Sequence, residues 1–448
     1  MSKDSSLMKR YNVPAPRYTS YPTVPFWDEA LFSSSSFINS LKNAVQDRQP
    51  LSLYIHLPYC ESLCTFCGCN KRITKNHEVE IPYINTLLKE WELYVSHMGF
   101  TPQVAELHFG GGTPTFFSPQ NLKRLIEGIF SVAHRAENFE FGFEGHPNNT
   151  SEEHIKTLAE LGFTRVSFGV QDVNLSIQTA INRIQPWENV ERVVSQARDY
   201  GYKSINFDLV YGLPFQKLAD VENTISKTVE LKPGRIAFYS YAHVPWIKGL
   251  GQRKFTEEDL PKNEEKRVLY EVGRSMLEEN GYREIGMDHF ALANDSLYLS
   301  MQNGGLHRNF MGYTSQRTKV MIGLGVSAIS DTSTAFAQNE KKIEDYMKRV
   351  NEGEIPVFRG HILTEEDIEI KEAILGLMCF GSTDIPAHYF TEISTRLKPL
   401  LDDGLITLED QKVTITETGK PFLRNVCMGF DMRLWRRSPK EQMFSMSV

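Results

Sequence analysis

The run Leu51-Ser52-Leu53-Tyr54-Ile55-His56-Leu57 is mostly apolar, stops at Pro58 and is followed almost at once by a group of cysteines. An apolar run of this length that ends at a proline predicts a buried strand. The cysteines are four of the six in the chain and fall within ten positions: Cys60, Cys64, Cys67 and Cys69. They therefore lie on a loop that leaves the carboxyl end of a strand.

The spacing of these cysteines favours an iron–sulfur site. A short loop can direct Cys60, Cys64 and Cys67 at one point, and cysteine thiolates are the usual ligands of iron–sulfur clusters. Three thiolates on a four-iron cluster leave one iron open to a substrate or cofactor, much as a catalytic zinc site keeps a free position. We expect Cys69 to stay outside the ligand set, with its side chain pointing away from Cys67.

Two other uses of the cysteines are weighed against this one. Structural zinc also takes cysteines two to four residues apart, but it would need further ligands, and Cys379 and Cys427 are isolated far downstream. Disulfides fit less well, because the four cysteines are crowded and the chain begins without the apolar segment of a signal peptide. On the residues alone, zinc remains the alternative.

The bulk composition indicates a soluble globular protein. The chain has 448 residues, of which 41% are hydrophobic and 23% charged, so it can form a main domain and one or two smaller ones. No apolar run is long enough to span a membrane. A net charge of −7 and a pI near 6.0 argue against a broad nucleic-acid surface. We expect a cytoplasmic protein that binds neither nucleic acid nor membrane.

Apolar runs and helical patterns alternate from residue 51 to about 242. The predicted strands are 51–57, 104–109, 139–144, 165–170, 204–210 and 235–241. The predicted helices are 80–98, 118–134, 151–161, 187–200 and 217–231. Six βα units in succession predict a parallel sheet with helical crossovers, and therefore an α/β barrel or part of one. In such barrels the chemistry lies at the carboxyl ends of the strands.

Polar and glycine residues fall at those strand ends. The second strand ends in Gly110-Gly111-Gly112-Thr113, where glycines permit close backbone approach to a ligand. The next three strands end at Glu144, Gln171 and Asp208. Together these positions predict one polar pocket at the mouth of the barrel.

The flanking segments complete the predicted organisation. We divide the chain into an extended N-terminal arm (1–50), the core barrel (51–245), a barrel extension with substrate and cofactor loops (246–360) and a C-terminal domain (361–448). The last segment has a helix that begins after Thr364 and a hairpin at 405–416, which is typical of a winged-helix module. Its many acidic residues favour a packing role over DNA binding.

The Cys-x3-Cys-x2-Cys loop after the first strand, with Phe66 before its third cysteine, resembles the radical S-adenosylmethionine (SAM) superfamily. This resemblance implies a partial (β/α)6 TIM-like barrel in which SAM chelates the open iron of a [4Fe–4S] cluster held by Cys60, Cys64 and Cys67. Over nearly the whole chain, the sequence further resembles the oxygen-independent coproporphyrinogen III oxidases. The segments that carry this wider resemblance are 16–23, 67–71, 110–115, 169–172, 208–214, 241–243, 286–291, 307–310 and 325–330.

The wider resemblance implies two SAM molecules. Position by position, the first would contact Tyr54, Gly111, Glu144, Ala242 and Ile329, and the second Phe66, Gly112, Thr113, Gln171, Arg183 and Asp208. Tyr54, His56 and Glu144 are the implied catalytic residues. The charges suit the ammonium, carboxylate and ribose hydroxyls of SAM. The chain departs from some members of the family at Gly145-His146 and at Met311.

The implied reaction is the oxidative decarboxylation of two propionates of coproporphyrinogen III to vinyl groups, which gives protoporphyrinogen IX. A 5′-deoxyadenosyl radical derived from SAM would remove the hydrogen atom. Arg17, His307 and Arg308 are the hypothesised cationic contacts to the propionates. The resemblance also implies an electron donor such as flavodoxin or ferredoxin, and a monomer. The alternatives are a radical SAM methylase or cyclopropanase that uses the second SAM as carbon donor, and a haem-binding chaperone.

Overall fold

The structure is a computed structural model that describes residues 3–244, 252, 255–437 and 443–447. The predicted boundary between the core barrel and its extension, at residue 245, lies outside the described residues. None of the described helices is both long and apolar enough to span a membrane.

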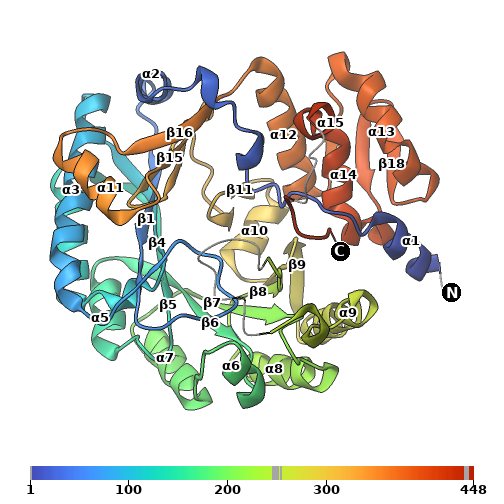
Figure 1. Ribbon diagram of the computed structural model, residues 1–448, viewed down its shortest axis with the longest axis horizontal. Coiled ribbons are helices and arrows are strands. Elements are labelled where there is room, and N and C mark those ends of the chain that lie inside the picture. Colours follow the sequence, from blue (N-terminus) through green and yellow to red (C-terminus); the bar gives the residue numbers. More distant parts are fainter. Residues whose placement is uncertain (1–2, 245–251, 253–254, 438–442, 448) are drawn as a thin grey trace.

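Six parallel strands form the centre of the molecule (Figure 1). They pair in the order β1-β4-β5-β6-β7-β8, so each strand lies beside the next one along the chain. Their bounds are β1 Leu51–Leu57, β4 Gln103–Gly111, β5 His134–Gly145, β6 Phe163–Gln171, β7 Ser204–Tyr211 and β8 Arg235–Ser240. The predicted α/β fold with a partial (β/α)6 barrel is confirmed.

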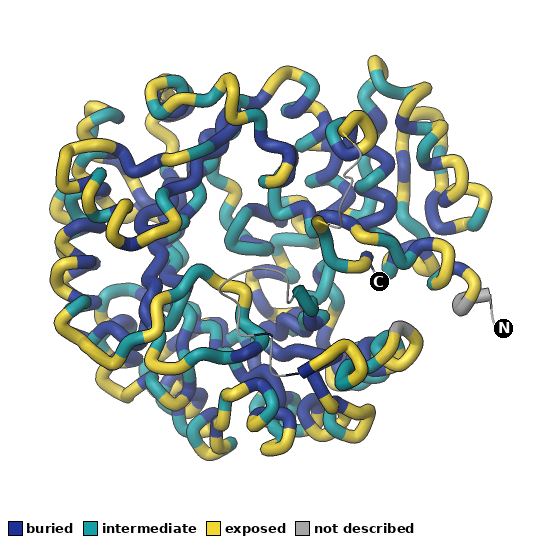
Figure 2. The backbone as a smooth tube through the Cα atoms, in the orientation of Figure 1, coloured by how far each residue is buried: buried dark blue, intermediate teal, exposed yellow. Residues whose placement is uncertain are grey.

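Helices follow the strands and cover the outer face of this sheet (Figures 1 and 2). The five predicted helices are all present: α3 Glu80–Met98, α4 Pro119–Ser131, α5 Glu152–Glu160, α7 Trp187–Asp199 and α8 Leu218–Glu230. A short additional helix, α6 (Leu175–Ala180), follows β6. The hydroxyls of Ser118 and Ser151 accept hydrogen bonds from the third residue of α4 and α5, so both predicted caps form.

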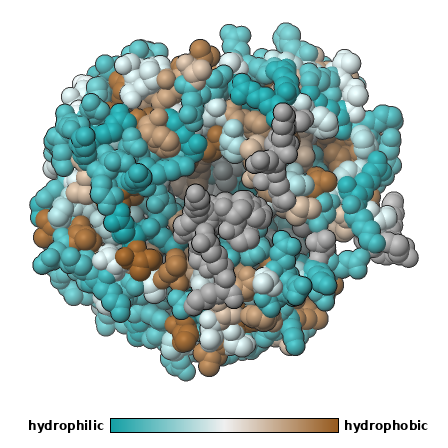
Figure 3. Space-filling view, in the orientation of Figure 1, coloured by the Kyte–Doolittle hydropathy of each residue, from teal (hydrophilic) through white to brown (hydrophobic). Residues whose placement is uncertain are grey.

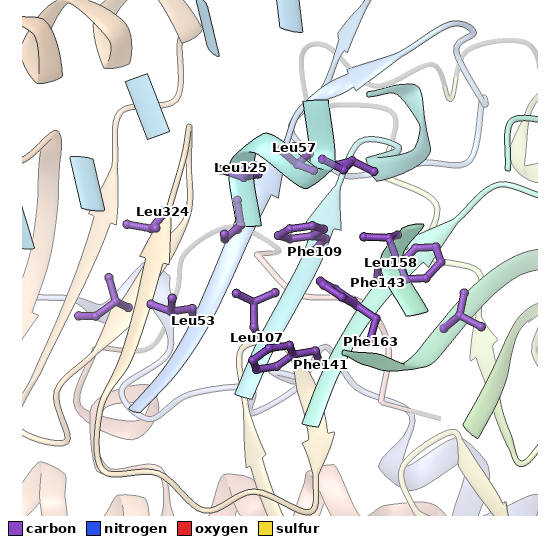
Figure 4. Close-up of a cluster of buried hydrophobic side chains, with 14 of the residues drawn as sticks. Leu53, Leu57, Leu107, Phe109, Leu125, Phe141, Phe143, Leu158, Phe163 and Leu324 are labelled. Carbon is purple, nitrogen blue, oxygen red and sulfur yellow. The ribbon is translucent and has the colours of Figure 1, made fainter. Parts of the chain in front are cut away.

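The main hydrophobic core lies between the sheet and these helices. Figure 4 shows side chains from successive strands, among them Leu53, Leu107 and Phe143, packing in rows with Leu125 of α4 and Leu158 of α5. All five are fully buried. Such side chains, each contributing about 1.5–3 kcal/mol when fully buried, hold the strand ends in fixed positions around the barrel mouth.

Further strands extend both edges of the sheet to twelve strands. On one side β13 (Met321–Leu324) pairs in parallel with β1, followed by β14 (Ile329–Asp331), β15 (Ala335–Asn339) and β16 (Val357–Ile362) with α11 (Ile343–Asn351). On the other side β10 (His289–Leu292) and β9 (Tyr282–Gly286) join β8, with α9 (Asn263–Glu279) and α10 (Ser296–Gln302). A separate hairpin joins β11 (His307–Asn309) to β12 (Gly312–Thr314).

The N-terminal segment is less extended than the sequence predicts. It contains α1 (Lys3–Tyr11) and α2 (Ser34–Ala44), and Ser33 caps α2 through reciprocal bonds with Ser36. Neither helix was predicted, because the extended tyrosine- and proline-rich part between them dominates the pattern. That part lies on the C-terminal domain, where Tyr18 donates to Asp431 at 3.0 Å.

The C-terminal residues form a small helical unit with its own core. Its helices are α12 (Glu365–Phe380), α13 (Phe390–Asp402), α14 (Leu423–Phe430) and α15 (Met432–Arg436). A three-stranded sheet in the order β17-β19-β18 accompanies them, formed by Ser382–Asp384, Lys412–Ile415 and Ile406–Glu409. The predicted Thr364 cap and hairpin are both present, which confirms the winged-helix-like pattern.

Candidate active site

The cysteine loop leaves β1 and returns beside it. Its two ends pair as the short parallel strands β2 (Tyr59–Cys60) and β3 (Arg72–Ile73), and the amide of Arg72 donates to the carbonyl of Pro58 at 2.8 Å. Within the loop, Lys71 donates from Nζ to the carbonyls of Cys67 and Cys69 at 3.2 and 3.3 Å. The backbone therefore holds the loop closed over the barrel mouth.

Cys60, Cys64 and Cys67 line one cavity of about 180 Å³ at this mouth. The Cys60 Sγ lies 3.3 Å from the hydroxyl of Thr113, and the Arg183 Nη1 lies 3.8 Å from the Cys64 Sγ. The predicted convergence of the three thiols on one space is therefore present, with Thr113 from the end of β4 and Arg183 from the loop after α6 around them.

Cys69 lies in the same cavity wall, contrary to the expectation that it points away. Its thiol hydrogen bonds with Cys67, an interaction that lowers the pKa of Cys67, and its surface is exposed to the cavity. The expectation was wrong because residues i and i+2 of an extended backbone point to the same side. Cys69 is a candidate contact for whatever the cavity binds.

The donor set fits a multi-iron cluster with an attached polar cofactor. No three Cys, His, Asp or Glu side chains in the described part of the chain gather closely enough to hold a single metal ion. A four-iron cluster is instead held at separate corners, which suits three thiols spread around one cavity. The buried Nε of Arg183 has no hydrogen-bond partner among the described residues, so a polar ligand is needed to satisfy it.

The glycine run packs directly against the cysteine loop. The amides of Gly112 and Thr113 donate to the carbonyls of Leu57 and Tyr59 at 2.8 and 3.0 Å. Gly111 has a φ of +112°, and a Cβ there would lie 2.8 Å from the ring of His56. A Cβ at Gly112 would meet the carbonyl of Pro58 at 2.6 Å. Glycine is therefore required for this strand end to reach the cysteines.

Glu144 reaches the cavity from the end of β5. Its Oε1 lies 3.5 Å from the Nε2 of His108, and 44% of its side chain is exposed, so the carboxylate is available to a ligand. The ring of His108 stacks on Tyr54 with 6.3 Å between the centroids. His108 was not predicted as a site residue. It lies two residues from Glu106 and from Gly110 along β4, so the three share one face of the strand, and this spacing could have indicated its inward-facing position.

Asp208 and Arg183 form the opposite wall. The Asp208 carboxylate accepts hydrogen bonds from Ser167 at 2.8 Å and Asn206 at 2.9 Å. Burial, together with the negative charge of Glu144, raises the pKa of Asp208 to about 6. Arg183 donates from Nη2 to the carbonyl of Gly169 at 2.6 Å. The cavity thus presents both a carboxylate and a guanidinium to a ligand.

A larger cavity of about 460 Å³ continues from the first into the barrel, and the face seen in Figure 1 is hollowed near its centre (Figure 3). The two share several wall residues, including Phe66, Glu144 and Asp208. The predicted cofactor contacts that line one or both are Phe66, Gly111, Gly112, Thr113, Glu144, Gln171, Arg183, Asp208 and Ala242. His146 lines the first cavity and Met311 the second, so both departures from the family lie at the site.

Three predicted residues lie behind these walls. Tyr54 lies under Gly110 and Glu144, and its hydroxyl is 3.2 Å from the Nδ1 of His56. His56 is buried beneath Gly111, and burial lowers the pKa of its ring. Ile329, on β14, packs with Trp27 and Phe336. Their direct contact with a cofactor remains a prediction.

The three predicted substrate contacts do not share one cavity. Arg17 lies 3.4 Å from Asp288 and lines a cavity between α9 and the C-terminal unit. His307 and Arg308 line a smaller space beneath Tyr18 and Tyr21. The sequence could not show that Arg17 lies in a different cavity from His307 and Arg308, because the two cavities form only when distant segments of the chain pack together.

Comparisons with known proteins agree with this geometry. Residues 54–228 match the model of the radical SAM superfamily. The oxygen-independent coproporphyrinogen III oxidase of Helicobacter pylori J99 is 41% identical over 96% of this chain and 97% of its own, and that of Escherichia coli K12 is 36% identical over 99% and 98%. This chain belongs to the oxygen-independent coproporphyrinogen III oxidase family. A solved structure of the Escherichia coli enzyme HemN, described as a radical SAM enzyme, superposes with a TM-score of 0.90 at 35% identity and covers 96% of this chain and 98% of its own.

Membership of the coproporphyrinogen III oxidase family identifies the cofactors as a [4Fe–4S] cluster and SAM. The resemblance drawn from the cysteine loop and the eight other segments is confirmed, since the match to these oxidases extends over nearly the whole chain.

Proposed function

We propose that this protein converts coproporphyrinogen III to protoporphyrinogen IX without oxygen, by oxidative decarboxylation of two propionate side chains. The observation that carries this proposal is the likeness to oxygen-independent coproporphyrinogen III oxidases over the full chain, joined to a cysteine-lined cavity that opens into a larger one. The larger cavity, at about 460 Å³, falls within the usual range for small-molecule sites.

The cluster site is assigned to Cys60, Cys64 and Cys67, with SAM on the remaining iron. When bound, the reduced cluster and SAM would supply a radical able to remove a hydrogen atom from the β-carbon of a propionate; loss of carbon dioxide to leave a vinyl group would then require an electron acceptor to take up one electron. Glu144 provides the carboxylate that holds an ammonium group of SAM, and Gly111, packed on the ring of His56, lines the same cavity. Ala242 completes this wall from the end of the barrel.

A second SAM is assigned to the opposite wall, beside Phe66, Gly112, Thr113, Gln171, Arg183 and Asp208. All six line the cysteine cavity. The unsatisfied Nε of Arg183 suits a carboxylate, and Asp208 suits a positively charged or hydroxyl group. The cavity therefore offers the carboxylates of Glu144 and Asp208 to the positive groups of SAM and the guanidinium of Arg183 to its carboxylate.

The barrel residues position the substrate and exclude water. Tyr239, Tyr241 and Tyr313 give the larger cavity an aromatic surface against which a tetrapyrrole can lie, and the thioether of Met311 lines it as well. Holding the reacting carbon near the radical is the main contribution of the protein, because correct placement alone removes several kcal/mol, about 7–11 in the best oriented cases, from a reaction barrier.

Arg308 and His307 are proposed contacts for propionates. Arg308 is 5% exposed, and its Nε and Nη1 have no hydrogen-bond partner among the described residues, which favours an anionic ligand. Burial lowers the pKa of His307 to about 4, so its ring is neutral and acts as a hydrogen-bond donor or acceptor, not as a cation. Arg17 is the third proposed contact.

We further propose a cytoplasmic monomer that receives electrons from a carrier such as flavodoxin or ferredoxin and binds neither nucleic acid nor membrane. The net charge of −7 supports the lack of a nucleic-acid surface.

The proposed function is tested by anaerobic incubation of the reconstituted protein with coproporphyrinogen III, SAM and a reductant, followed by mass analysis of the oxidised porphyrins. We expect products that have lost one and then two carboxyl groups. Products that gain mass would favour a radical SAM methylase or cyclopropanase. Stable haem binding without SAM cleavage would favour a chaperone.

A further inference from the structure

A cationic cavity of about 70 Å³ lies outside the barrel, where the N-terminal arm, β8, α9 and the C-terminal unit meet. Its volume is several times the roughly 10–15 Å³ that one water molecule needs. Five cationic side chains line it: Arg17, Arg267, Arg274, Lys420 and Arg424. Only two carboxylates, Glu284 and Asp288, are in its described lining. This excess of positive charge stands out in a chain whose net charge is −7.

Two cations beside this cavity, the buried Arg424 and the half-buried Lys266, donate mainly to backbone carbonyls, and Arg424 also donates to the Ser445 hydroxyl at 3.3 Å. Arg424 is 7% exposed and donates to the carbonyls of Ala15, Pro16, Ser445 and Met446. Lys266 donates to the carbonyl of Tyr241 at 2.7 Å, and its Nζ lies over the ring of Tyr211 in the cavity wall. The other cations of the cavity pair with carboxylates, as Arg17 does with Asp288, but no ion pair among the described residues involves Lys266 or Arg424. Buried charges are normally paired, so an anionic ligand would complete this site.

The cations also act on one another. Burial, with the charges of Arg17 and Arg424 and against an opposing effect of Asp288, lowers the pKa of Lys266 to about 8. Burial and the charge of Arg17 likewise lower the pKa of Arg424 to about 10. A bound carboxylate would offset this repulsion in a place of low dielectric constant, where its effect is strong.

This cavity adjoins the reaction cavity at the rim of the barrel. Ser240, at the end of β8, lines both, and its neighbours Tyr239 and Tyr241 line the reaction cavity. The two arginines deep in the reaction cavity are already paired, since Arg165 contacts Glu140 at 2.5 Å and Arg235 contacts Asp295 at 2.6 Å. Across the rim, Arg267 and Arg274 pair with Glu271 and Glu278 of their own helix. These pairs are partly exposed and use only some of the N–H groups of each guanidinium, so the remaining N–H groups can still bind a carboxylate.

We propose that this cavity binds the carboxylate of a propionate that is not reacting, while the tetrapyrrole ring lies over the reaction cavity. The inference rests on the proposed function, because it takes the substrate to be a tetracarboxylate. It assigns substrate contacts to two residues of α9, Arg267 and Arg274, that no motif indicated. Their seven-residue separation places both on one face of the helix.

The test measures the binding of coproporphyrin III, the stable oxidised tetraacid, by fluorescence quenching with the SAM-loaded, cluster-reconstituted protein. Arg267→Gln and Arg274→Gln should each raise the Kd for the tetraacid about tenfold, as expected for the loss of one charge-assisted hydrogen bond. Arg267→Lys, which keeps the charge, should restore most of the affinity. Arg283→Gln is the matched control, because Arg283 is exposed on β9 and outside the cavity lining, and should leave the Kd unchanged.

The tetramethyl ester of coproporphyrin III separates charge recognition from packing. Wild type and Arg267→Gln should bind the ester with equal affinity, because it has no carboxylates. The inference is overturned if both glutamine variants bind the tetraacid as tightly as wild type, or if they weaken the ester equally. Binding needs no turnover, so a failed subsite leaves decarboxylation by the wild type intact. A failed proposed function would instead appear as wild-type protein that forms no decarboxylated product.

Discussion

The imidazole of His56 on β1 donates from Nε2 to the carbonyl oxygen of Asn70, which lies 2.8 Å away near the end of the cysteine loop. Its Nδ1 accepts from the hydroxyl of Tyr54 at 3.2 Å. Burial lowers the pKa of His56, so the ring is neutral and can act as donor on one side and acceptor on the other. A residue beneath the cavity thus fixes the loop that carries the cluster.

Removing this bond should loosen the cluster loop. His56→Ala leaves the Asn70 carbonyl without its buried donor, and we expect the free energy of unfolding to fall by about 1–3 kcal/mol. The iron and sulfide content after reconstitution should fall as well. His388→Ala, at an exposed histidine of the C-terminal unit, is the control and should change neither quantity. Full iron content with unchanged stability in His56→Ala would contradict this role.

The four cysteines should separate into two classes. Cys60→Ala, Cys64→Ala and Cys67→Ala should each abolish the visible absorption of the cluster and the cleavage of SAM, since each removes one of the three proposed ligands. Cys69→Ala should keep the cluster absorption, because the three remaining thiols are intact. Iron and sulfide analysis checks both outcomes. Loss of iron in Cys69→Ala to the same extent as in Cys64→Ala would show that Cys69 is a ligand.

Glu144 should contribute to SAM affinity without holding the cluster. Glu144→Gln keeps the size of the side chain but removes its charge, and we expect the Kd for SAM to rise at least tenfold, as for other lost charge-assisted hydrogen bonds of about 1.5–3 kcal/mol. Equilibrium dialysis with labelled SAM measures the change, and the cluster absorption should stay the same. Glu137→Gln, at an exposed position of the same strand, is the matched control.

The affinity for SAM should depend on pH through Asp208. Its pKa is raised to about 6 by burial and by Glu144, so the carboxyl group is charged above that pH and neutral below it. SAM carries positive charge, and its Kd should therefore rise several-fold as the pH falls from about 7.5 to about 5. Asp208→Asn should bind SAM more weakly at high pH and lose much of this pH dependence. An equally steep profile in Asp208→Asn would assign the effect to another group.

The barrel could be predicted because its signals are local. Each strand is a short apolar run that ends in glycine or a polar residue, and each helix has a hydrophobic face and often a cap such as Ser118 or Thr364. The parallel order then follows from the alternation of strands and helices. The cysteine spacing predicted three thiols around one space, and the strand ends predicted Glu144, Gln171 and Asp208, which line the same cavity.

The rest depends on contacts between segments far apart in the chain. Lys266 and Arg424 come close enough to influence each other's charge only in the folded chain, where α9 and α14 both lie near the arm, so no spacing within the sequence connects them. The separation of Arg17 from His307 and Arg308 has the same origin. The two unpredicted helices, α1 and α2, flank the proline-rich stretch, and α1 is stabilised by packing Leu7 and Tyr11 into the C-terminal core.

The central claim is that the cysteine cavity generates a radical that acts on a propionate of the tetrapyrrole. Its most direct test uses coproporphyrinogen III with deuterium at the β-carbons of the propionates, incubated anaerobically with the reconstituted protein, SAM and a reductant. We expect the recovered 5′-deoxyadenosine to carry deuterium and to appear in step with the loss of carboxyl groups from the porphyrin. Decarboxylated porphyrin accompanied by 5′-deoxyadenosine without deuterium, or intact SAM, would contradict the central claim.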